Sequence, residues 1–374
     1  MNNDCVPTLP RKVAVGNRRS FLRKGLAAAG AATTAAGLLS AQQTNSGQLT
    51  PGDTAILRFL AAAEIIESDL WEQYNELGGI QDSEEPSGTG NPAYTAALQN
   101  LDGDMAQYIH DNTDDEFSHQ NFLNAYLASK HAPTVSFEPF RTLPGSTATG
   151  SSGKLRITNL MQLTVDTSWY TRYRSGTQNS DLDPNVVFPQ AVPGLSAGQF
   201  TAIPRTDADL SPADHLQAIA NTAAFHFADV EQGGSSLYPS LAQRVTNPEV
   251  LRILLSIGPV ETSHFQTWFD TAGNAVSQPL APLTDPTNGL VFPDLNSPPY
   301  GGETYQTNLI MPEPCPFISG SLPPCSVIRP TATMGIAMGV VDFLVAEGLF
   351  IGQSAAFFEF LNGLARAADA ARRL

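Results

Sequence analysis

Two glutamate–histidine pairs in the chain share one spacing, Glu-x-x-His. They are Glu116 with His119 and Glu261 with His264. A helix places residues i and i+3 on one face, so each pair directs a carboxylate and an imidazole toward the same point. Carboxylate and imidazole ligands suit iron, manganese or zinc. The two pairs therefore predict a metal site between two helices.

Two further glutamates extend this pattern. Glu64 is followed seven residues later by Trp71, and Glu231 is followed at the same distance by Tyr238, each aromatic being preceded by a leucine. Aligning Glu64 with Glu231 makes the chain a duplicated helix pair, in which each half supplies one bridging glutamate and one Glu-x-x-His. Di-iron and di-manganese carboxylate bundles have this ligand set, with one Glu from each of two helices and Glu-x-x-His from each of the other two.

Two of the predicted ligands have rivals. Glu67 also precedes an aromatic residue by seven positions and lies on the same helical face as Glu64. The leucine–aromatic match favours Glu64. Two glycines follow Glu231, and each weakens a helix by about 1 kcal/mol relative to alanine, so Asp166, which also has an aromatic seven residues later, competes with Glu231.

With these motifs the chain resembles the ferritin-like superfamily, and within it the ferritin-like domain family that includes the desiccation-related proteins. The resemblance covers residues 53 to 272 and is interrupted by an insertion. It implies an all-α four-helix bundle that holds two iron or manganese ions. Iron or manganese is favoured over zinc because four carboxylates make a hard ligand set. The implied ligands are Glu64, Glu116, His119, Glu231, Glu261 and His264.

The resemblance implies two main hypotheses for the function. The first is a redox enzyme whose small-molecule oxidant is peroxide or dioxygen. The alternative is a non-catalytic desiccation or stress protein with a vestigial or structural site, and iron storage comes third because a storage cage needs compact subunits. In a working centre the ligand histidines need acceptors that fix the ring, and Asp114, Asp115 and Asp229 are the candidates.

Residues 1 to 41 predict a twin-arginine signal peptide. Arg18 and Arg19 precede an alanine-rich apolar run over 25–39, which is shorter than the about 20 residues that a membrane-spanning helix needs. This predicts export to the periplasm or the extracellular space. The net charge of −16 becomes more negative when the basic signal is removed, and nucleic acid is an unlikely partner because phosphate binding needs a basic surface.

The predicted bundle covers residues 50 to 273. Its first helix begins with a cap at Asp53 or Thr54 and ends near 78–79, and its second helix covers 91–129. An insertion at about 132–210 contains one short helix around 155–173. Ser211 is expected to cap the third helix, and the fourth covers 248–272, with a kink at Pro259.

Residues 274 to 374 are predicted to form a C-terminal extension. Its irregular arm contains Cys315 and Cys325, which in an oxidising compartment would form a disulfide or stay as two free thiols. Two helices follow, over 334–349 and 353–373. Acidic residues interrupt the first, so it does not predict a membrane segment. The apolar face of the second is explained either by core packing or by contact with another copy in a homo-oligomer.

Overall fold

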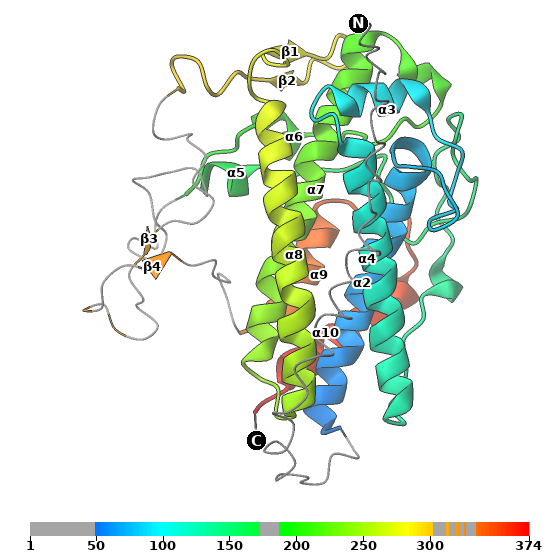
Figure 1. Ribbon diagram of the computed structural model, residues 1–374, viewed down its shortest axis with the longest axis vertical. Coiled ribbons are helices and arrows are strands. Elements are labelled where there is room, and N and C mark those ends of the chain that lie inside the picture. Colours follow the sequence, from blue (N-terminus) through cyan, green and yellow to red (C-terminus); the bar gives the residue numbers. More distant parts are fainter. Residues whose placement is uncertain are drawn as a thin grey trace, which may run out of the picture. The chain divides into compact units, whose positions relative to one another are not determined.

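Four long helices run side by side at the centre of the computed structural model (Figure 1). α2 packs against α4, and α7 packs against α8, so the bundle consists of two helix pairs. The predicted all-α ferritin-like bundle is therefore confirmed. The four helices are α2 (Pro51–Gly78), α4 (Met105–Ser129), α7 (Ala213–Ala242) and α8 (Pro248–Asn274).

The structure describes residues 49–172, 187–301, 312–313, 319, 321, 325–326 and 334–373. All of these belong to one unit of the chain, residues 49–374. The predicted signal peptide, residues 1–41, lies outside the described residues. So does Cys315, and only the backbone of Cys325 is described, so the predicted disulfide stays a prediction.

The N-terminus of α2 begins earlier than the sequence suggested. Thr50 is the N-cap, and its Oγ1 accepts a hydrogen bond of 3.0 Å from the backbone N–H of Asp53. Proline directly after the cap suits the first helical position, where no N–H is needed. The carboxylate of Asp53 accepts the backbone N–H groups of Thr246 and Asn247. The start of α2 is thereby tied to the turn between α7 and α8.

The predicted second helix is divided into two. α3 (Pro92–Gln99) ends before the bundle helix α4 begins at Met105. Gly103 lies in the break, and the side chain of Asp102 accepts the backbone N–H of Asp104 at 2.9 Å. Glycine and aspartate both favour such turns over a helix interior, which explains why one continuous helix over 91–129 was wrong.

The second helix pair follows the prediction more closely. The N-cap of α7 is Pro212, which makes no side-chain capping bond, so the predicted cap at Ser211 is wrong. α7 continues through Gly233 and Gly234, and α8 continues through Pro259. Most residues of α7 are buried. Tertiary packing therefore offsets the low helix propensity of the two glycines.

The described residues of the insertion, 132–172 and 187–210, form only short helical segments. The predicted helix over 155–173 is wrong for most of its length, because the backbone N–H groups of Ile157 and Thr158 donate to Asp69 Oδ2 on α2, at 2.9 and 2.8 Å. These bonds hold that stretch in an irregular conformation against the bundle. The segments are η1 (Glu138–Phe140), α5 (Ser168–Arg172), α6 (Pro193–Ala197) and η2 (Asp207–Leu210).

The described part of the C-terminal extension adds two short antiparallel strand pairs and two helices. β1 (Leu283–Thr284) pairs with β2 (Val291–Phe292), and β3 (Pro312–Glu313) pairs with β4 (Cys325–Ser326). The helices are α9 (Ile336–Ala346) and α10 (Ala355–Ala370).

Both C-terminal helices pack on the bundle. α10 packs against α2 and α9, and α9 packs against α7. Asp369 of α10 accepts the first backbone N–H groups of α9, from Ala337 and Met338, at 3.1 and 2.9 Å. A carboxylate at a helix N-terminus satisfies free donors and interacts favourably with the helix dipole. Phe357 is fully buried within this chain, beside Phe350 with ring centroids 4.8 Å apart.

None of the helices in the described part of the chain is long and apolar enough to cross a membrane.

Candidate metal centre

Six side chains from the four long helices converge inside the bundle. They form two overlapping groups, and the possible ligand atoms of each group all lie within 4.8 Å of one another. The first group is Glu64, Glu116, His119 and Glu261. The second group is Glu116, Glu231, Glu261 and His264. The structure thus brings together all six residues that the sequence suggested as ligands, and it places them at two adjacent positions.

The two groups share Glu116 and Glu261, the glutamates of the Glu-x-x-His pairs. Glu64 and Glu231 each belong to one group only. The overlap thus favours Glu116 and Glu261 over Glu64 and Glu231 as the carboxylates that would bridge two metal ions. The rotation of each helix about its own axis decides which carboxylate reaches the middle of the bundle, and spacing along one helix does not give that rotation.

His119 lies against three carboxylates at once. Its Nδ1 is 3.3 Å from Glu64 Oε2, 3.2 Å from Glu116 Oε2 and 3.2 Å from Glu261 Oε1. One ring nitrogen cannot donate a proton to three acceptors. Bonds of about 2.0–2.2 Å to a metal put neighbouring ligand atoms about 3 to 3.5 Å apart. The spacing around His119 is therefore that of donors around one cation.

His264 repeats this arrangement in the second group. Its Nδ1 is 3.1 Å from Glu116 Oε1, 3.4 Å from Glu231 Oε2 and 3.9 Å from Glu261 Oε2. Glu116 thus offers one oxygen to each histidine, and Glu261 does the same. This is the geometry of a carboxylate that bridges two metal positions.

Burial leaves several of these donor atoms without partners. The four carboxylates are 0% exposed, and the two histidines are 8% and 9% exposed. The atoms without a hydrogen-bond partner are Glu64 Oε2, Glu231 Oε2, Glu261 Oε1, Glu261 Oε2 and His264 Nδ1. Unpartnered polar atoms in a protein interior are costly. Two divalent cations would provide the missing partners, so the residues fit a two-metal centre.

The pKa values of the carboxyl groups reflect this crowding. Burial raises the pKa of Glu64 to about 7, although the charge of His119 opposes the shift. Burial, followed by the charge of Glu116, raises the pKa of Glu261 well above its usual range. Burial also acts on Glu116, but the close contacts with His119 and His264 outweigh it and lower its pKa. A metal requires ionised carboxylates, so its binding would be coupled to proton release.

Each aromatic residue of the repeated motif donates a hydrogen bond to the glutamate of the other half. Trp71, seven residues after Glu64, donates its indole N–H to Glu231 Oε1 at 3.1 Å. Tyr238, seven residues after Glu231, donates its hydroxyl to Glu64 Oε1. Each half of the duplication therefore orients the glutamate of the other half. This gives a physical reason for the spacing that the two halves share.

The sequence analysis missed one polar residue at the centre, Asn112. Its Nδ2 donates to Glu116 Oε1 at 2.9 Å and to Glu231 Oε1 at 3.1 Å, and its Oδ1 accepts the indole N–H of Trp268 at 2.8 Å. Asn112 precedes Glu116 by four residues, which places both on one helical face. That spacing was the available signal.

A second residue that contacts the ligands is Asp115. Its Oδ2 is 3.1 Å from His264 Nε2, the nitrogen that faces away from the centre. A carboxylate there fixes the tautomer and orientation of a ligand histidine. Of the three predicted acceptors Asp115 is thus the one in contact, since Asp114 lies beside Glu85 and Asp229 lies near Glu347.

A family model described as the ferritin-like domain matches residues 52–274. The chain belongs to the ferritin-like domain family. The match contains the four long helices, the insertion and all six converging residues, and it ends before the C-terminal extension. No curated protein and no solved structure matches the chain.

Neither of the rival ligands, Asp166 and Glu67, belongs to the two ligand groups of this ferritin-like domain. Asp166 is exposed and accepts hydrogen bonds from Ser168 and Gln190, so it does not replace Glu231. Glu67 belongs to neither ligand group but lies beside them: burial raises its pKa well above its usual range, and the charges of Glu116 and Glu261 raise it further.

One of the two histidines of α7, His226, lies outside the centre in a second buried polar cluster. Its Nδ1 is 2.6 Å from the hydroxyl oxygen of Tyr74, and its Nε2 is 3.2 Å from Glu347 Oε1. Glu347 comes from the end of α9. The C-terminal extension thus supplies a buried partner to a residue of the ferritin-like domain.

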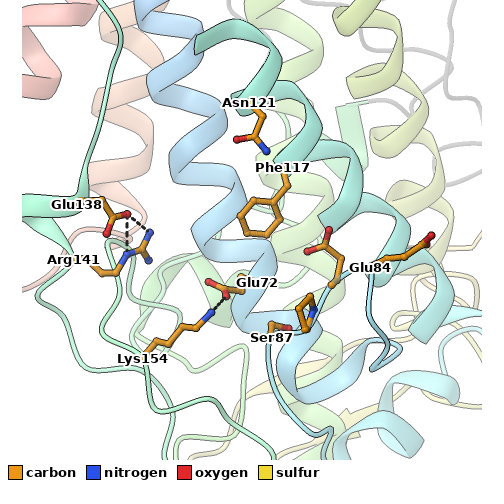
Figure 2. A pocket seen from close by; sticks show the side chains of 10 residues that line it. Glu72, Glu84, Ser87, Phe117, Asn121, Glu138, Arg141 and Lys154 are labelled. Carbon is orange, nitrogen blue, oxygen red and sulfur yellow. Dashed lines mark hydrogen bonds and ion pairs between the residues drawn. The ribbon is translucent and has the colours of Figure 1, made fainter. Parts of the chain in front are cut away.

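An open pocket of about 620 Å³ lies between α2, α4 and the insertion (Figure 2). Its basic side chains are paired: Lys154 contacts Glu72 at 2.5 Å, and Arg141 contacts Glu138 at 3.2 Å. None of the described residues that line it is one of the six candidate ligands. This pocket is therefore separate from the candidate metal centre.

Proposed function

We propose that this ferritin-like protein holds two iron or manganese ions and acts as a redox enzyme on peroxide or dioxygen. The observation that carries the proposal is the pair of overlapping ligand groups with unpartnered, fully buried oxygen atoms. Four carboxylates and two imidazoles form a hard ligand set with one histidine at each position, which suits iron or manganese. Bound iron or manganese would supply the electrons exchanged with the oxidant.

The residues of the chain would give such a centre its order. Glu116 and Glu261, shared by both groups, would keep the two ions adjacent. The donors Trp71, Tyr238 and Asn112 orient the carboxylates. Burial of the carboxylates excludes bulk water, which strengthens every electrostatic contact inside.

A non-catalytic stress or desiccation protein is the competing function. In that case the six side chains would form a structural cluster without metal. Such a cluster should pair its own donors and acceptors, yet both oxygens of Glu261 have no hydrogen-bond partner. The unpaired atoms therefore favour the metal centre over the structural cluster.

We further propose that the protein is exported by the twin-arginine route, on the basis of the sequence around Arg18 and Arg19. Replacing both arginines by lysine should retain the protein in the cytoplasm, as measured by cell fractionation and immunoblotting. Unchanged export of this double variant would contradict the proposal.

Metal analysis of the exported, folded protein tests the metal centre. We expect about two iron or manganese ions per chain, as in other carboxylate bundles of this type, and loss of metal in Glu116→Ala. Glu138→Ala is the matched control, because Glu138 is exposed and pairs with Arg141 far from the ligand groups. A metal-free wild-type protein would refute the proposal. Metal retained in Glu116→Ala would refute the site assignment.

The redox activity needs a separate measurement. Metal-loaded protein should consume peroxide or dioxygen, and His119→Ala and His264→Ala should lose metal and activity together. A protein that binds two ions but reacts with neither oxidant would point instead to the non-catalytic alternative.

A further inference from the structure

A small apolar pocket lies between α2, α7 and α9. Aliphatic and aromatic side chains form its walls, and Glu67 is the one polar side chain among the described lining residues. Its free volume is about 20 Å³, and about 10–15 Å³ on this measure already admits one molecule of the size of water. The pocket therefore has room for a very small molecule. The side chains that the argument uses are Ile66, Leu70, Leu237, Val340 and Phe343.

This pocket adjoins the candidate metal centre. Glu67 lines it and lies close enough to the ligands for the charges of Glu116 and Glu261 to act on its carboxyl group. Gly234 also lines it, and a Cβ atom at that position would be only 3.1 Å from Glu261 Oε2. Gly234 thus separates the pocket from the carboxylate of Glu261 by no more than its own backbone.

The neighbouring Gly233 keeps the pocket open. A Cβ atom built there meets no other atom within 4 Å, so this position in the middle of α7 faces open space. Glycine in a helix interior costs about 1 kcal/mol relative to alanine. Two consecutive glycines at this point of α7 therefore carry a cost in stability. Gly233 leaves open space in the pocket, and Gly234 leaves room for the close approach of Glu261.

One side of the pocket is formed by α9, through Val340, Phe343 and Leu344. These residues lie beyond the part of the chain that matches the family model. Residues 63, 67, 233, 340 and 343 are partly exposed, so the pocket opens to solvent on this side of the bundle. The extension thus covers one side of a partly open pocket whose lining residue Gly234 lies next to the candidate ligand Glu261.

We propose that this pocket is the route by which dioxygen, rather than hydrogen peroxide, reaches the candidate metal centre. The inference rests on the proposed function and specifies its oxidant. Dioxygen is small and apolar, and it loses no hydrogen bonds when it enters an aliphatic pocket. Hydrogen peroxide carries two O–H donors, and the described lining offers them only Glu67. Burying a donor without an acceptor is unfavourable, so the lining selects dioxygen.

The first test measures binding of dioxygen without any reaction. The full chain is labelled at its Ile, Leu and Val methyl groups in the presence of zinc, which has no redox chemistry, and is pressurised with dioxygen, whose paramagnetism enhances NMR relaxation. Methyl groups of Ile66 and Leu237 should relax faster than that of Leu127, which is equally buried on α4 but does not line the pocket.

The matched variants are Gly233→Leu and Gly363→Leu. Both glycines lie inside helices with open space at the Cβ position, but only Gly233 lines the pocket. Gly233→Leu should reduce the enhancement at Ile66 and Leu237 to the level of Leu127, and Gly363→Leu should leave it unchanged. Equal enhancement at pocket and reference methyl groups, or enhancement that persists in folded Gly233→Leu, would overturn the proposal.

The second test uses the iron-loaded protein and both oxidants. Gly233→Leu should slow oxidation by dioxygen and leave the rate with hydrogen peroxide unchanged. An equal effect on both rates would show that the pocket does not select between them. A wild-type chain that binds no metal would refute the proposed function, while the NMR measurement would still decide whether dioxygen occupies the pocket.

Discussion

Replacing Asp115 by asparagine tests how the candidate centre is built around its ligands. The carboxylate of Asp115 lies 3.1 Å from His264 Nε2 and is the group that can hold this ring in the orientation that turns Nδ1 toward the carboxylates. Asparagine keeps the size of the side chain and removes its charge. The variant should therefore weaken metal binding at the His264 position without removing any ligand.

The magnitude follows from the contact. A hydrogen bond to a charged group contributes about 1.5–3 kcal/mol. The side chain of Asp115 is 24% exposed, so solvent screening puts the expected loss at the lower end. A loss of about 1.4 kcal/mol corresponds to a tenfold change in Kd. We therefore expect one of the two ions to bind about tenfold more weakly, which agrees with the smaller effects found for outer partners of metal ligands.

Competition with a chelator of known affinity measures both binding steps, with Mn²⁺ as the ion. Asp114→Asn is the control, because it removes the same charge from the adjacent residue of α4 and Asp114 lies beside Glu85 rather than His264. If both variants weaken binding equally, the effect is one of general charge and the assigned contact has no special role. If Asp115→Asn binds both ions as tightly as the wild type, the reasoning is refuted.

Three further outcomes follow from contacts described above. Gly234→Ala should bind metal more weakly, because its Cβ would be 3.1 Å from Glu261 Oε2. This is expected even though alanine favours a helix by about 1 kcal/mol relative to glycine. A rise in Tm on addition of Mn²⁺ that is the same for the variant and the wild type would contradict this. Thr50→Ala should lower the free energy of unfolding in urea by about 1 kcal/mol through loss of the α2 cap, and an unaltered midpoint would show that the cap contributes nothing. A hydrogen bond with Asp111 is the main cause that raises the pKa of His110 to about 9. This exceeds the pKa of about 6.5 for histidine in the unfolded chain. The protonated ring therefore stabilises the fold fully below about pH 6.5, and this stability is lost as the pH rises through about 9. His110→Gln should accordingly lose less stability than the wild type between these pH values. If the urea unfolding midpoints of both proteins change equally with pH, His110 does not have this stabilising role.

The sequence predicted the existence of the four long helices, although it merged α3 with α4. Periodicity is informative there because it depends on local burial. Apolar residues recur at helical spacing in α2 and α8, and the buried faces of these helices follow that spacing. The breaks were harder to predict. The cap at Thr50 and the interruption around Gly103 depend on which polar side chain captures which backbone N–H. Several local choices compete at such positions, and tertiary contacts such as that of Asp53 with Thr246 decide between them.

The candidate site could likewise be predicted only in part from the sequence. Spacing alone brought Glu-x-x-His onto one helical face, and the leucine–aromatic match chose Glu64 over Glu67 as the residue that lies in a ligand group. Spacing could not show that Glu116 and Glu261 are the shared carboxylates, because that depends on how four helices are rotated against one another. Nor could it show that Trp71 bonds to Glu231 instead of Glu64, since this contact joins opposite halves of the duplication.

The contacts of the C-terminal helices bear on what part of this chain can stand alone. The match to the family model ends at residue 274, yet α10 packs on α2, Glu347 lies beside His226 inside the bundle, and α9 lines the apolar pocket. A fragment that ends at residue 274 would expose the apolar surface that α10 buries. The part of the chain that matches the family model thus leaves out helices that complete the packing of the bundle.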